Sequence, residues 1–226
     1  MQDNKNQTDI AIPELTEASV TGIQNQTLAE QRRDQICEAA LELFLQKGFA
    51  STTIRDICNR SGVNQASIYD YIANKNDILR RLLNKMWFRS GALNLDEILE
   101  QHPERSLQEN VSDYLRNFWA KKRKGTLLAY RTVPHLTKSD RKAMRTRDEM
   151  VIGKLADQIR QLTALPENDP RAQVMANLII FMAGFGPLRD WLHTDLDSEL
   201  VSDTVSAAIV AMIENLANSS PSTPDQ

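Results

Sequence analysis

Apolar residues recur at helical spacing along almost the whole chain, and this pattern restricts the fold it can adopt. Between residues 27 and 217 they return every three or four positions, the spacing that gathers side chains on one face of a helix. We find no segment with the alternation of a half-buried strand. The sequence therefore predicts an all-α fold of about nine helices. Polar residues and prolines predict a disordered arm over residues 1–26 and a disordered tail over 218–226.

Local start and stop signals divide this pattern into elements. Thr27 and Thr53, each with an acid three residues later, fit capping boxes for the first two helices, and Gly48 stands where the first should end. We expect Gly125 to separate two helices and Pro134 to end the second of them. The further helices are expected from Asn74 to about Gly91, from Ser106 to the basic run 121–124, over 125–133, after Thr137, from Asp169 to about Trp191, and after Asp197.

Residues 53–75 carry the most specific local pattern. They predict two short helices, over residues 53–60 and 64–72, joined by a tight turn in which Gly62 takes a positive φ at no steric cost. The two helices share an apolar stripe, while the second presents amides, a hydroxyl and two phenols on its polar side. Such a short polar face is typical of a helix that enters a DNA major groove. The pattern therefore predicts a helix-turn-helix that binds double-stranded DNA.

The distribution of charge agrees with this interpretation. The net charge of −3 is unusual for a nucleic-acid-binding protein. However, residues 28–91 hold ten Lys and Arg against seven Asp and Glu, a sum of +3, whereas residues 1–27 and 92–226 each sum to −3. Positive charge is thus concentrated where phosphate contacts are expected.

Other functional classes find little support in the sequence. Cys37 and Cys58 are too few for a disulfide framework, and neither they nor the three histidines show the spacing of metal ligands. A Gly-rich phosphate loop, a nucleophile elbow and paired acid–base residues are all absent, so we expect neither an enzyme nor a bound cofactor. We find no apolar run near about 18 residues and no signal-peptide pattern, and therefore expect a cytoplasmic protein without a membrane span.

An ordered set of residues along the first third of the chain has a known counterpart. The set is Ile36, Ala39, Ala40, Leu43, Phe44, Gly48, Phe49, Thr52, Thr53, Ile57, Gly62, Val63, Ile68, Tyr69, Lys75 and Leu79. With it, residues 30–79 resemble the DNA-binding domain of the TetR family of one-component bacterial regulators. Cys58, Ala66 and Ile72 depart from that family's usual Ala, Gly and Phe, but each keeps a small or apolar group.

The resemblance implies a division of the chain and a mode of action. A helix-turn-helix domain is expected over residues 27–75, and a ligand-binding and dimerisation domain over 76–217. In the family, a small molecule usually enters the helical core and changes the spacing of two DNA-binding heads. We therefore expect a repressor that leaves its operator when it binds a small effector. Activation is the alternative, because the sign of regulation depends on the position of the operator.

Nine residues are candidates for DNA contact: Thr52, Thr53, Arg55, Asn64, Gln65, Ser67, Tyr69, Tyr71 and Lys75. The two threonines stand at a helix N-terminus, where hydroxyls and free N–H groups bind phosphate. The amides of Asn64 and Gln65 can pair with adenine, and Gln65 ranks first because Asn64 has the alternative role of a helix N-cap. The resemblance assigns the two tyrosines and Lys75 to the DNA backbone; the alternative for Lys75 is an exposed lysine.

Aromatic and polar residues of the larger domain are candidates for an effector cavity. They are Trp87, Trp119, Tyr130, Arg131, His135, Met150, Phe181 and Phe185, and plain core packing is the alternative for each. The effector class left open by these residues is aromatic, lipidic or acyl-CoA-like. The basic run 121–124 and the pair Arg131 and His135 could hold an anionic group. Their alternatives are a solvated helix C-terminus and a solvent-facing pair.

One short helix covers few base pairs, so a near-palindromic operator bound by a homodimer is expected. The candidates for the dimer interface are Leu178, Ile179, Met182, Val201, Val205, Ile209 and Met212, at helical spacing on the last two helices. Intramolecular packing is the alternative for either helix. A second function remains possible, a helix-turn-helix fold that binds a protein without binding an operator. Asp70 favours it, since a carboxylate faces phosphates poorly.

Overall fold

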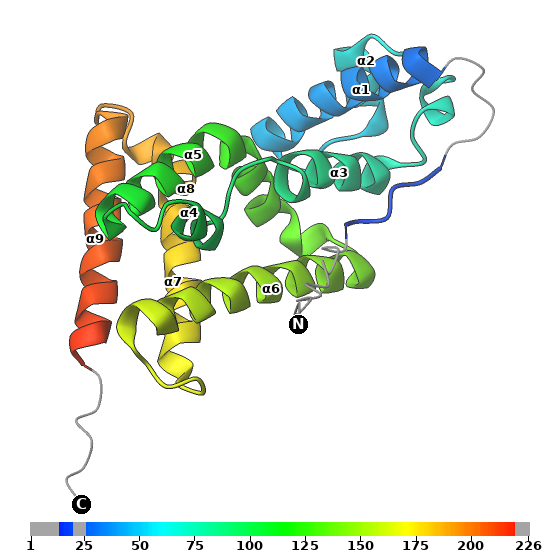
Figure 1. Cartoon of the computed structure of the whole chain (residues 1–226). Coiled ribbons are helices and arrows are strands. Elements are labelled where there is room, and N and C mark those ends of the chain that lie inside the picture. Colours follow the sequence, from blue (N-terminus) through cyan, green and yellow to red (C-terminus); the bar gives the residue numbers. More distant parts are fainter. Residues whose placement is uncertain (1–13, 20–25, 220–226) are drawn as a thin grey trace, which may run out of the picture.

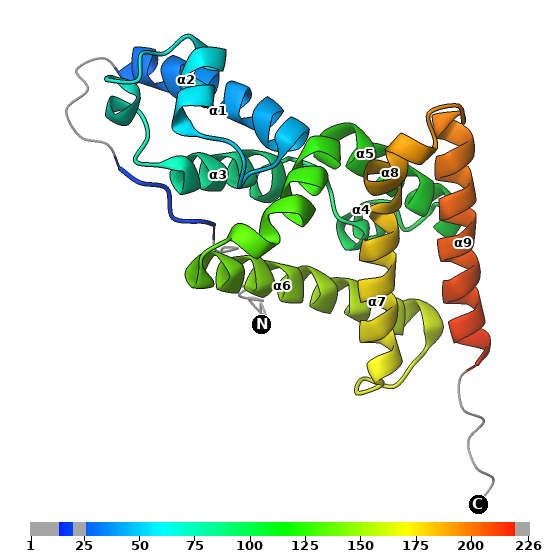
Figure 2. The same cartoon turned by 180° about the vertical axis from the view of Figure 1, so that it is seen from behind.

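The computed structural model describes residues 14–19 and 26–219, and helices joined by short loops make up most of the longer range. The helices are α1 (Gln26–Lys47), α2 (Ile54–Ser61), α3 (Lys75–Leu83), α4 (Leu95–Gln101), α5 (Leu107–Thr132), α6 (Lys138–Thr163), α7 (Pro170–Ala183), α8 (Phe185–Arg189) and α9 (Ser198–Asn218). Neither described range contains a β-strand. Figures 1 and 2 show α1–α3 at one end and α7–α9 at the other, with α5 between them. The all-α prediction, with its helix-turn-helix domain first, is confirmed.

The head formed by α1, α2 and α3 closes around a small apolar core. Phe44 and Phe49 meet edge to face with ring centroids 5.0 Å apart. Fully buried aliphatic residues complete the core: Ile36, Ile57, Ile68, Ile72 and Ile78. Gly48 and Gly62 end α1 and α2 with φ angles of 88° and 71°, in the left-handed region that glycine tolerates. The sharp reversals expected at both glycines are therefore present.

Several predicted helix boundaries were wrong. Thr27 already lies inside α1, so it does not cap that helix. α5 runs unbroken through Gly125, where two helices were expected, because this glycine lies where α5 crosses the chain after α3. A Cβ atom there would stand 2.6 Å from the carbonyl oxygen of Met86, so only glycine permits the close approach. The expected eighth helix ends at Ala183, and α4 is a helix of its own.

α3 passes into a turn of π-helix, η2 (Asn84–Phe88), which joins the head to the larger domain. η2 packs against α5. Trp87 in η2 is 8% exposed and meets Phe118 of α5 edge to face at 6.5 Å between centroids. π-Helical turns are uncommon and often occur at functional positions. η2 therefore connects α3 of the head to the larger domain, and we call this connection the joint.

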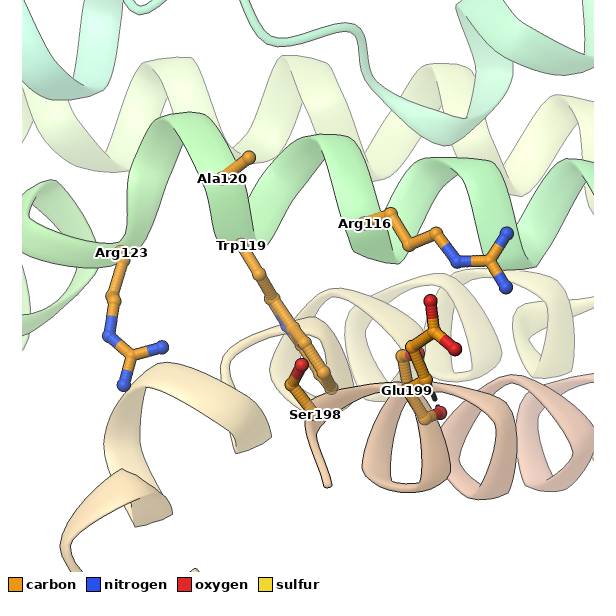
Figure 3. A pocket seen from close by; sticks show the side chains of 7 residues that line it. Arg116, Trp119, Ala120, Arg123, Ser198 and Glu199 are labelled. Atoms are coloured by element: carbon orange, nitrogen blue, oxygen red, sulfur yellow. Dashed lines mark hydrogen bonds between the residues drawn. The ribbon is translucent and has the colours of Figure 1, made fainter. Parts of the chain in front are cut away.

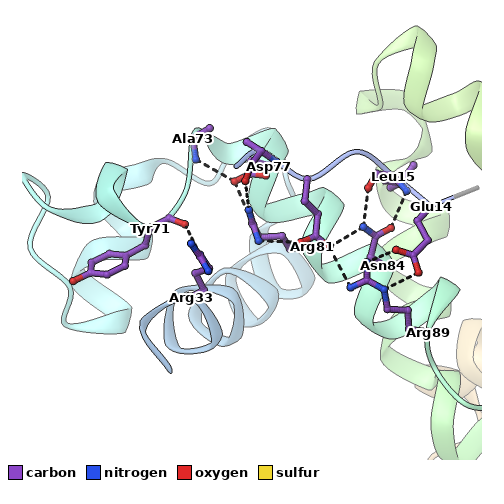
Figure 4. A network of polar contacts seen from close by, with 11 residues as sticks. Glu14, Leu15, Arg33, Tyr71, Ala73, Asp77, Arg81, Asn84 and Arg89 are labelled. Carbon is purple, nitrogen blue, oxygen red and sulfur yellow. Dashed lines mark hydrogen bonds and ion pairs between the residues drawn. The ribbon is translucent and has the colours of Figure 1, made fainter. Parts of the chain in front are cut away.

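Part of the expected disordered arm is ordered. Residues 14–19 lie along α3 and η2, and Leu15 is only 3% exposed. The carboxylate of Glu17 accepts from Arg81 at 2.9 Å, and Arg89 pairs with Glu14 (Figure 4). Residues 1–13 and 20–25 of that arm, and 220–226 of the expected tail, lie outside the described residues.

α9 is apolar enough to pass a test of length and composition for membrane-spanning helices. Its best 18-residue window has a mean hydropathy of 1.4, and 39% of that window is buried. α7 together with the segment Phe185–Leu192 passes the same test as a pair bent by 46°. Core helices of soluble proteins also meet this criterion. In this chain α9 packs on α5, α6 and α7, which buries Ile209 and Ile213.

Candidate nucleic-acid interface and ligand cavity

The N-terminus of α2 is fixed by the predicted capping box. Thr53 Oγ1 accepts from Asp56 N at 3.1 Å, and Asp56 Oδ2 accepts from Thr53 N at 2.8 Å. Lys47, whose ammonium lies 2.7 Å from Asp56 Oδ2, and Thr53 hold the pKa of that carboxyl well below its usual range. Thr52 differs from the expectation: it is 1% exposed, and its hydroxyl donates inward to Gly48 O at 2.8 Å. Of the two threonines, only Thr53 is exposed.

Lys75 does not reach outward as the resemblance implied. Its Nζ donates to three carbonyl oxygens, those of Thr52 at 2.8 Å, Phe49 at 2.9 Å and Ala50 at 3.4 Å. It also lies 4.5 Å from the centroid of the Phe49 ring. An ammonium group has three N–H donors, and all three are engaged. Lys75 therefore ties the loop before α2 to the start of α3.

The segment expected as a helix over 64–72 is a tighter coil of turns. Its regular part is a 3₁₀ turn, η1 (Ile68–Asp70). Asn64 Oδ1 accepts from Ala66 N at 2.9 Å in a local turn, and no helix begins at Asn64, as its alternative role of helix N-cap would require. Ser67 Oγ donates to Asn64 O at 3.2 Å. Because short polar side chains bond to their own backbone here, they compete with regular helical bonding.

The coil still presents the expected side chains. Ile68 and Ile72 are fully buried and anchor it to the head. Gln65 is exposed and Tyr69 is 52% exposed, while Tyr71 is half-buried with its carbonyl accepting from Arg33. The anchored face and the polar face are therefore separated as a groove-reading segment requires. Asp70 is exposed on the same coil.

Ion pairs consume much of the head's positive charge. The pairs are Lys47–Asp56, Arg60–Glu42, Arg80–Asp140, Arg81 with Asp77 and Glu17, and Lys85–Asp34. Among the residues that the structure describes, Arg32, Arg33 and Arg55 have no carboxylate partner within ion-pair distance, and Arg32 and Arg55 are exposed. Counting charges in the sequence predicts the excess of positive charge over residues 28–91. It does not predict that Arg32 and Arg33 are among the arginines left without a carboxylate, because ion pairs depend on contacts between residues distant in sequence.

A cavity of about 270 Å³ lies between η2, α5, α6 and α7. Its walls are Trp87, Phe118, Thr126, Ala129, Tyr130, Val133, Met144, Asp148, Ile152, Asn177, Ile180 and Phe181. Three of the eight cavity candidates, Trp87, Tyr130 and Phe181, are brought together here. The rest of the wall was missed, because its small and aliphatic members look like ordinary core in a sequence.

The other five candidates lie elsewhere. Trp119 points from α5 into a shallow hollow between Arg116 and Arg123, above the start of α9, and donates Nε1–H to Ala183 O at 2.8 Å (Figure 3). Arg131 donates to Leu45 O at 2.6 Å. The last three are His135, against the Phe49 ring, Phe185, against His193, and Met150, which does not line the cavity.

Two buried cations beside the cavity were not identified from the sequence. Lys122 is 3% and Arg147 6% exposed. The basic run 121–124, for which both an anion-binding role and a solvated helix C-terminus were considered, lies inside α5 rather than at its end, and its second lysine is buried. Burial, with the charge of Arg147 as a smaller cause, lowers the pKa of Lys122 to about 8. Both pack on the Trp87 ring, whose centroid lies 5.6 Å from Lys122 Nζ and 5.2 Å from Arg147 Cζ.

The candidate dimer residues divide into two groups. Ile179, Val205 and Ile209 are buried within the chain, as the intramolecular alternative required. Leu178 is 41% exposed, and Met182, Val201 and Met212 are half-buried. Large apolar residues stand exposed around them: Val174, Phe181, Phe185, Trp191, Leu192, Leu196 and Leu200. The outer face of α7–α9 is thus an extensive apolar surface.

Known proteins resemble this chain in sequence. The family model described as bacterial regulatory proteins, tetR family, matches residues 36–82. The HTH-type transcriptional regulator HbdR of Aromatoleum sp. (strain CIB) is 28% identical over 200 residues, which are 83% of this chain and 81% of HbdR. A probable acrEF/envCD operon repressor of Escherichia coli (strain K12) is 30% identical over 88 residues, 39% of this chain and 37% of that repressor.

Solved structures share the fold. A TetR-family transcriptional regulator from Bordetella parapertussis 12822 matches with a TM-score of 0.59 and 22% identity, over 81% of this chain and 94% of that one. A bacterial regulatory protein in the tetR family from Rhodococcus RHA1 reaches 0.64 at 16% identity, over 81% of this chain and 97% of that one.

Proposed function

Because this chain belongs to the TetR family of bacterial regulatory proteins and is a transcriptional regulator, we propose that it binds a palindromic operator as a homodimeric repressor and that a small molecule releases it. The similarity to a probable operon repressor supports repression as the mode of control. The relatives are regulators rather than enzymes, which agrees with a cytoplasmic protein that needs no cofactor.

One observation carries the proposal for operator binding. Ile68 and Ile72 are fully buried and hold the segment 64–72 against the head, while Gln65 and Tyr69 are exposed on it. Gln65 carries the donor and acceptor pair that recognises adenine, and Tyr69 carries a hydroxyl for phosphate. Arg55 on the neighbouring α2 adds an exposed positive charge. We assign base recognition to Gln65, with Asn64 and Ser67 shaping the coil that presents it.

The apolar outer face of α7–α9 supports the homodimer. Val174 is 68%, Trp191 69% and Leu200 57% exposed in the single chain. A soluble protein rarely leaves such a contiguous surface in water, and a two-fold interface would cover it with the same surface of a second copy. Dimerisation also sets the spacing of two heads, so that they meet successive major grooves about 34 Å apart.

The joint between head and core supports release by a small molecule. The cavity wall includes Trp87, which belongs to η2, and η2 continues directly into α3 of the head. A ligand that moves Trp87 would therefore rotate α3 and, with it, the segment 64–72 that carries Gln65 and Tyr69. Such a change alters the spacing of two heads and lowers affinity for a fixed operator.

Fluorescence anisotropy with DNA from upstream of the protein's own gene tests operator binding. We expect saturable binding with two protomers per site. Gln65→Ala should weaken it by about 1–3 kcal/mol and relax base preference at one position per half-site. Gln46→Ala is the matched control, since this exposed glutamine lies at the end of α1 next to α5 and should leave affinity unchanged. Equal effects of the two substitutions, or no binding at low salt, would refute the proposal.

A further inference from the structure

Lys122 and Arg147 are buried cations with too few acceptors. No described residue accepts a hydrogen bond from Lys122 Nζ or forms an ion pair with it; the ammonium lies over the Trp87 and Phe118 rings at 5.6 and 5.5 Å. Arg147 Nε also lacks a partner within the described residues. Its other nitrogens reach only Asp148 Oδ1 at 3.2 Å and Trp87 O at 3.5 Å. A buried charge is costly unless it is paired and hydrogen-bonded.

The carboxylates around these cations do not neutralise them. Asp148, the direct partner of Arg147, has a side chain that is 50% exposed, so water weakens that pair. Glu97 on α4 faces Lys122 from further away, and its carboxylate already accepts from Asn94 N at 2.6 Å. Lys122 and Arg147 also repel each other, which destabilises both charges. Asp148, which belongs to the cavity wall, and Glu97 therefore compensate the two buried cations only in part.

Two further donors in the cavity wall lack partners. Trp87 Nε1 and Thr126 Oγ1 are buried and make no hydrogen bond within the described residues. Thr126 follows Lys122 by one helical turn on α5, so their side chains lie on the same face. A carboxylate accepts up to four hydrogen bonds, in charge-assisted form from Lys and Arg. Among the described residues around the cavity, the groups with unsatisfied donors are thus four, Lys122, Arg147, Trp87 and Thr126. One carboxylate can accept a hydrogen bond from each of them.

The rest of the cavity defines the body of such a ligand. Apolar side chains make up most of the wall: Phe118, Ala129, Val133, Met144, Ile152 and Ile180. Tyr130 and Phe181 are 45% and 58% exposed, so the cavity opens to solvent between α5 and α7. A volume of about 270 Å³ is small for a ligand site and leaves no space for a nucleotide-sized group.

We propose that this cavity binds a small organic carboxylate, aromatic or with a short aliphatic chain. Its carboxylate is attracted by Lys122 and Arg147, which pack on aromatic rings of the wall, and accepts from Trp87 Nε1 and Thr126 Oγ1 in the wall itself. Its apolar body fills the space between α5, α6 and α7. The proposal rests on the function proposed above, in which a small molecule controls the regulator, and it names that molecule's chemical class. It turns two unsatisfied buried charges into the recognition elements of the site.

The same geometry links occupancy to the head. Both cations lie over the ring of Trp87. A carboxylate that attracts them would weaken these cation–π contacts, which hold the Trp87 side chain in place. Trp87 cannot adjust alone, because Gly125 of α5 packs directly on the carbonyl of Met86. Movement at Trp87 is therefore passed along η2 into α3. Carboxylate binding should shift η2 as a unit.

Isothermal titration calorimetry of the full chain at pH 7 tests the site without DNA. The probes are benzoate and octanoate, with octanol and octylamine as neutral and cationic analogues. We expect at least one carboxylate to bind, and its neutral and cationic analogues to bind about tenfold more weakly or not at all. Binding of octanol as tight as that of octanoate, or binding of neither carboxylate, overturns the proposal.

Substitutions assign the recognition to the named residues. Lys122→Met keeps the side chain's length, removes an unpaired buried charge and should lower carboxylate affinity by about tenfold or more. Lys124→Met removes the same charge two residues away on the exposed side of α5 and should leave affinity unchanged. Thr126→Val, which is isosteric, provides a second variant that should also weaken binding. Unchanged affinity in both Lys122→Met and Thr126→Val overturns the assignment.

Anisotropy on the operator, measured in parallel, separates the two proposals. Carboxylate binding without release of DNA would leave the site standing and refute control through it. Absence of operator binding would refute the proposed function, while calorimetry still decides on the carboxylate site.

Discussion

The side-chain amide of Asn84 pairs with both backbone groups of Leu15. Asn84 Oδ1 accepts from Leu15 N at 2.9 Å, and Asn84 Nδ2 donates to Leu15 O at 2.8 Å (Figure 4). Asn84 is the first residue of η2 and has no exposed surface. Ala18 N donates to Asp77 Oδ1 at 2.8 Å, one step nearer the head. Residues 14–18 therefore fasten η2 to α3 along the joint between head and core.

Loss of this pairing should destabilise the joint. Asn84→Ala leaves the backbone N–H and C=O of Leu15 without partners in a buried setting, so we expect a loss of about 1–3 kcal/mol in the free energy of unfolding. Lys85→Ala is the control, because this neighbouring lysine is exposed and pairs with Asp34 at the surface, a contact worth about 0–1 kcal/mol. Urea denaturation measures both. Equal losses in the two variants would mean that the segment 14–18 does not fasten the joint.

Lys75 and Arg55 should respond differently to salt. Arg55→Gln removes an exposed charge available to phosphate, which should reduce the slope of log Kobs against log[salt] by about 0.9. Lys75→Met should weaken operator binding by displacing the loop that Lys75 holds, with the slope unchanged, since its ammonium binds three carbonyl groups. Anisotropy titrations over a range of salt concentrations make the comparison. A reduced slope for Lys75→Met would restore this lysine as a direct phosphate contact.

Gly125 and Gly153 offer a matched test of the crossing between α5 and η2. A Cβ at Gly125 would stand 2.6 Å from Met86 O and 3.1 Å from Met86 Cβ, both backbone-proximal atoms that cannot move aside freely. Gly125→Ala should therefore destabilise the fold by about 1–3 kcal/mol. At Gly153, inside α6, a Cβ meets no atom within 4 Å, so Gly153→Ala should stabilise by about 0.5–1 kcal/mol. Thermal unfolding of both variants is the measurement, and effects of equal sign would contradict the structure.

Local signals in the sequence predicted local structure well. Thr53 with Asp56, Asn74 and Ser106 each cap the helix that they were expected to cap, because capping involves residues three apart. Gly62 also takes the expected conformation. Such features depend on nothing beyond a few neighbouring residues.

Features that depend on distant contacts were not predictable. Gly125 looked like a break until its contact with Met86 was known, since glycine's cost in a helix is offset only by that close approach. Leu15 belongs to a polar segment, but its side chain joins the hydrophobic core while Asn84 binds its backbone. Lys122 sits in a basic run whose orientation on α5 follows from how that helix packs. Residues 64–72 were expected to form a helix and form turns instead, because side-chain hydrogen bonds at Asn64 compete with helical ones.

Lys122 should make the free energy of unfolding increase with pH above about 8, the direction expected for a buried lysine. Burial lowers its pKa to about 8 in the folded chain, below the usual value for lysine, while Arg147 and Asp148 on α6 and Glu97 on α4 are the charged groups that act on it. Between these two pKa values the unfolded chain binds more protons than the folded one, so this group makes stability rise with pH above about 8. Below pH 8 the folded chain bears the full cost of the buried charge.

Lys122→Met should remove both effects. We expect the variant to be more stable than the unmodified chain by about 1–3 kcal/mol at pH 7, with a smaller difference at pH 9.5, where the lysine is already neutral in the folded chain. Lys124→Met, on the exposed side of the same helix, should match the unmodified chain at both values. Urea unfolding at the two pH values gives the numbers. A stabilised variant that no longer binds carboxylate would show that Lys122 is kept for recognition at the expense of stability, whereas a destabilised one would make it an ordinary structural residue.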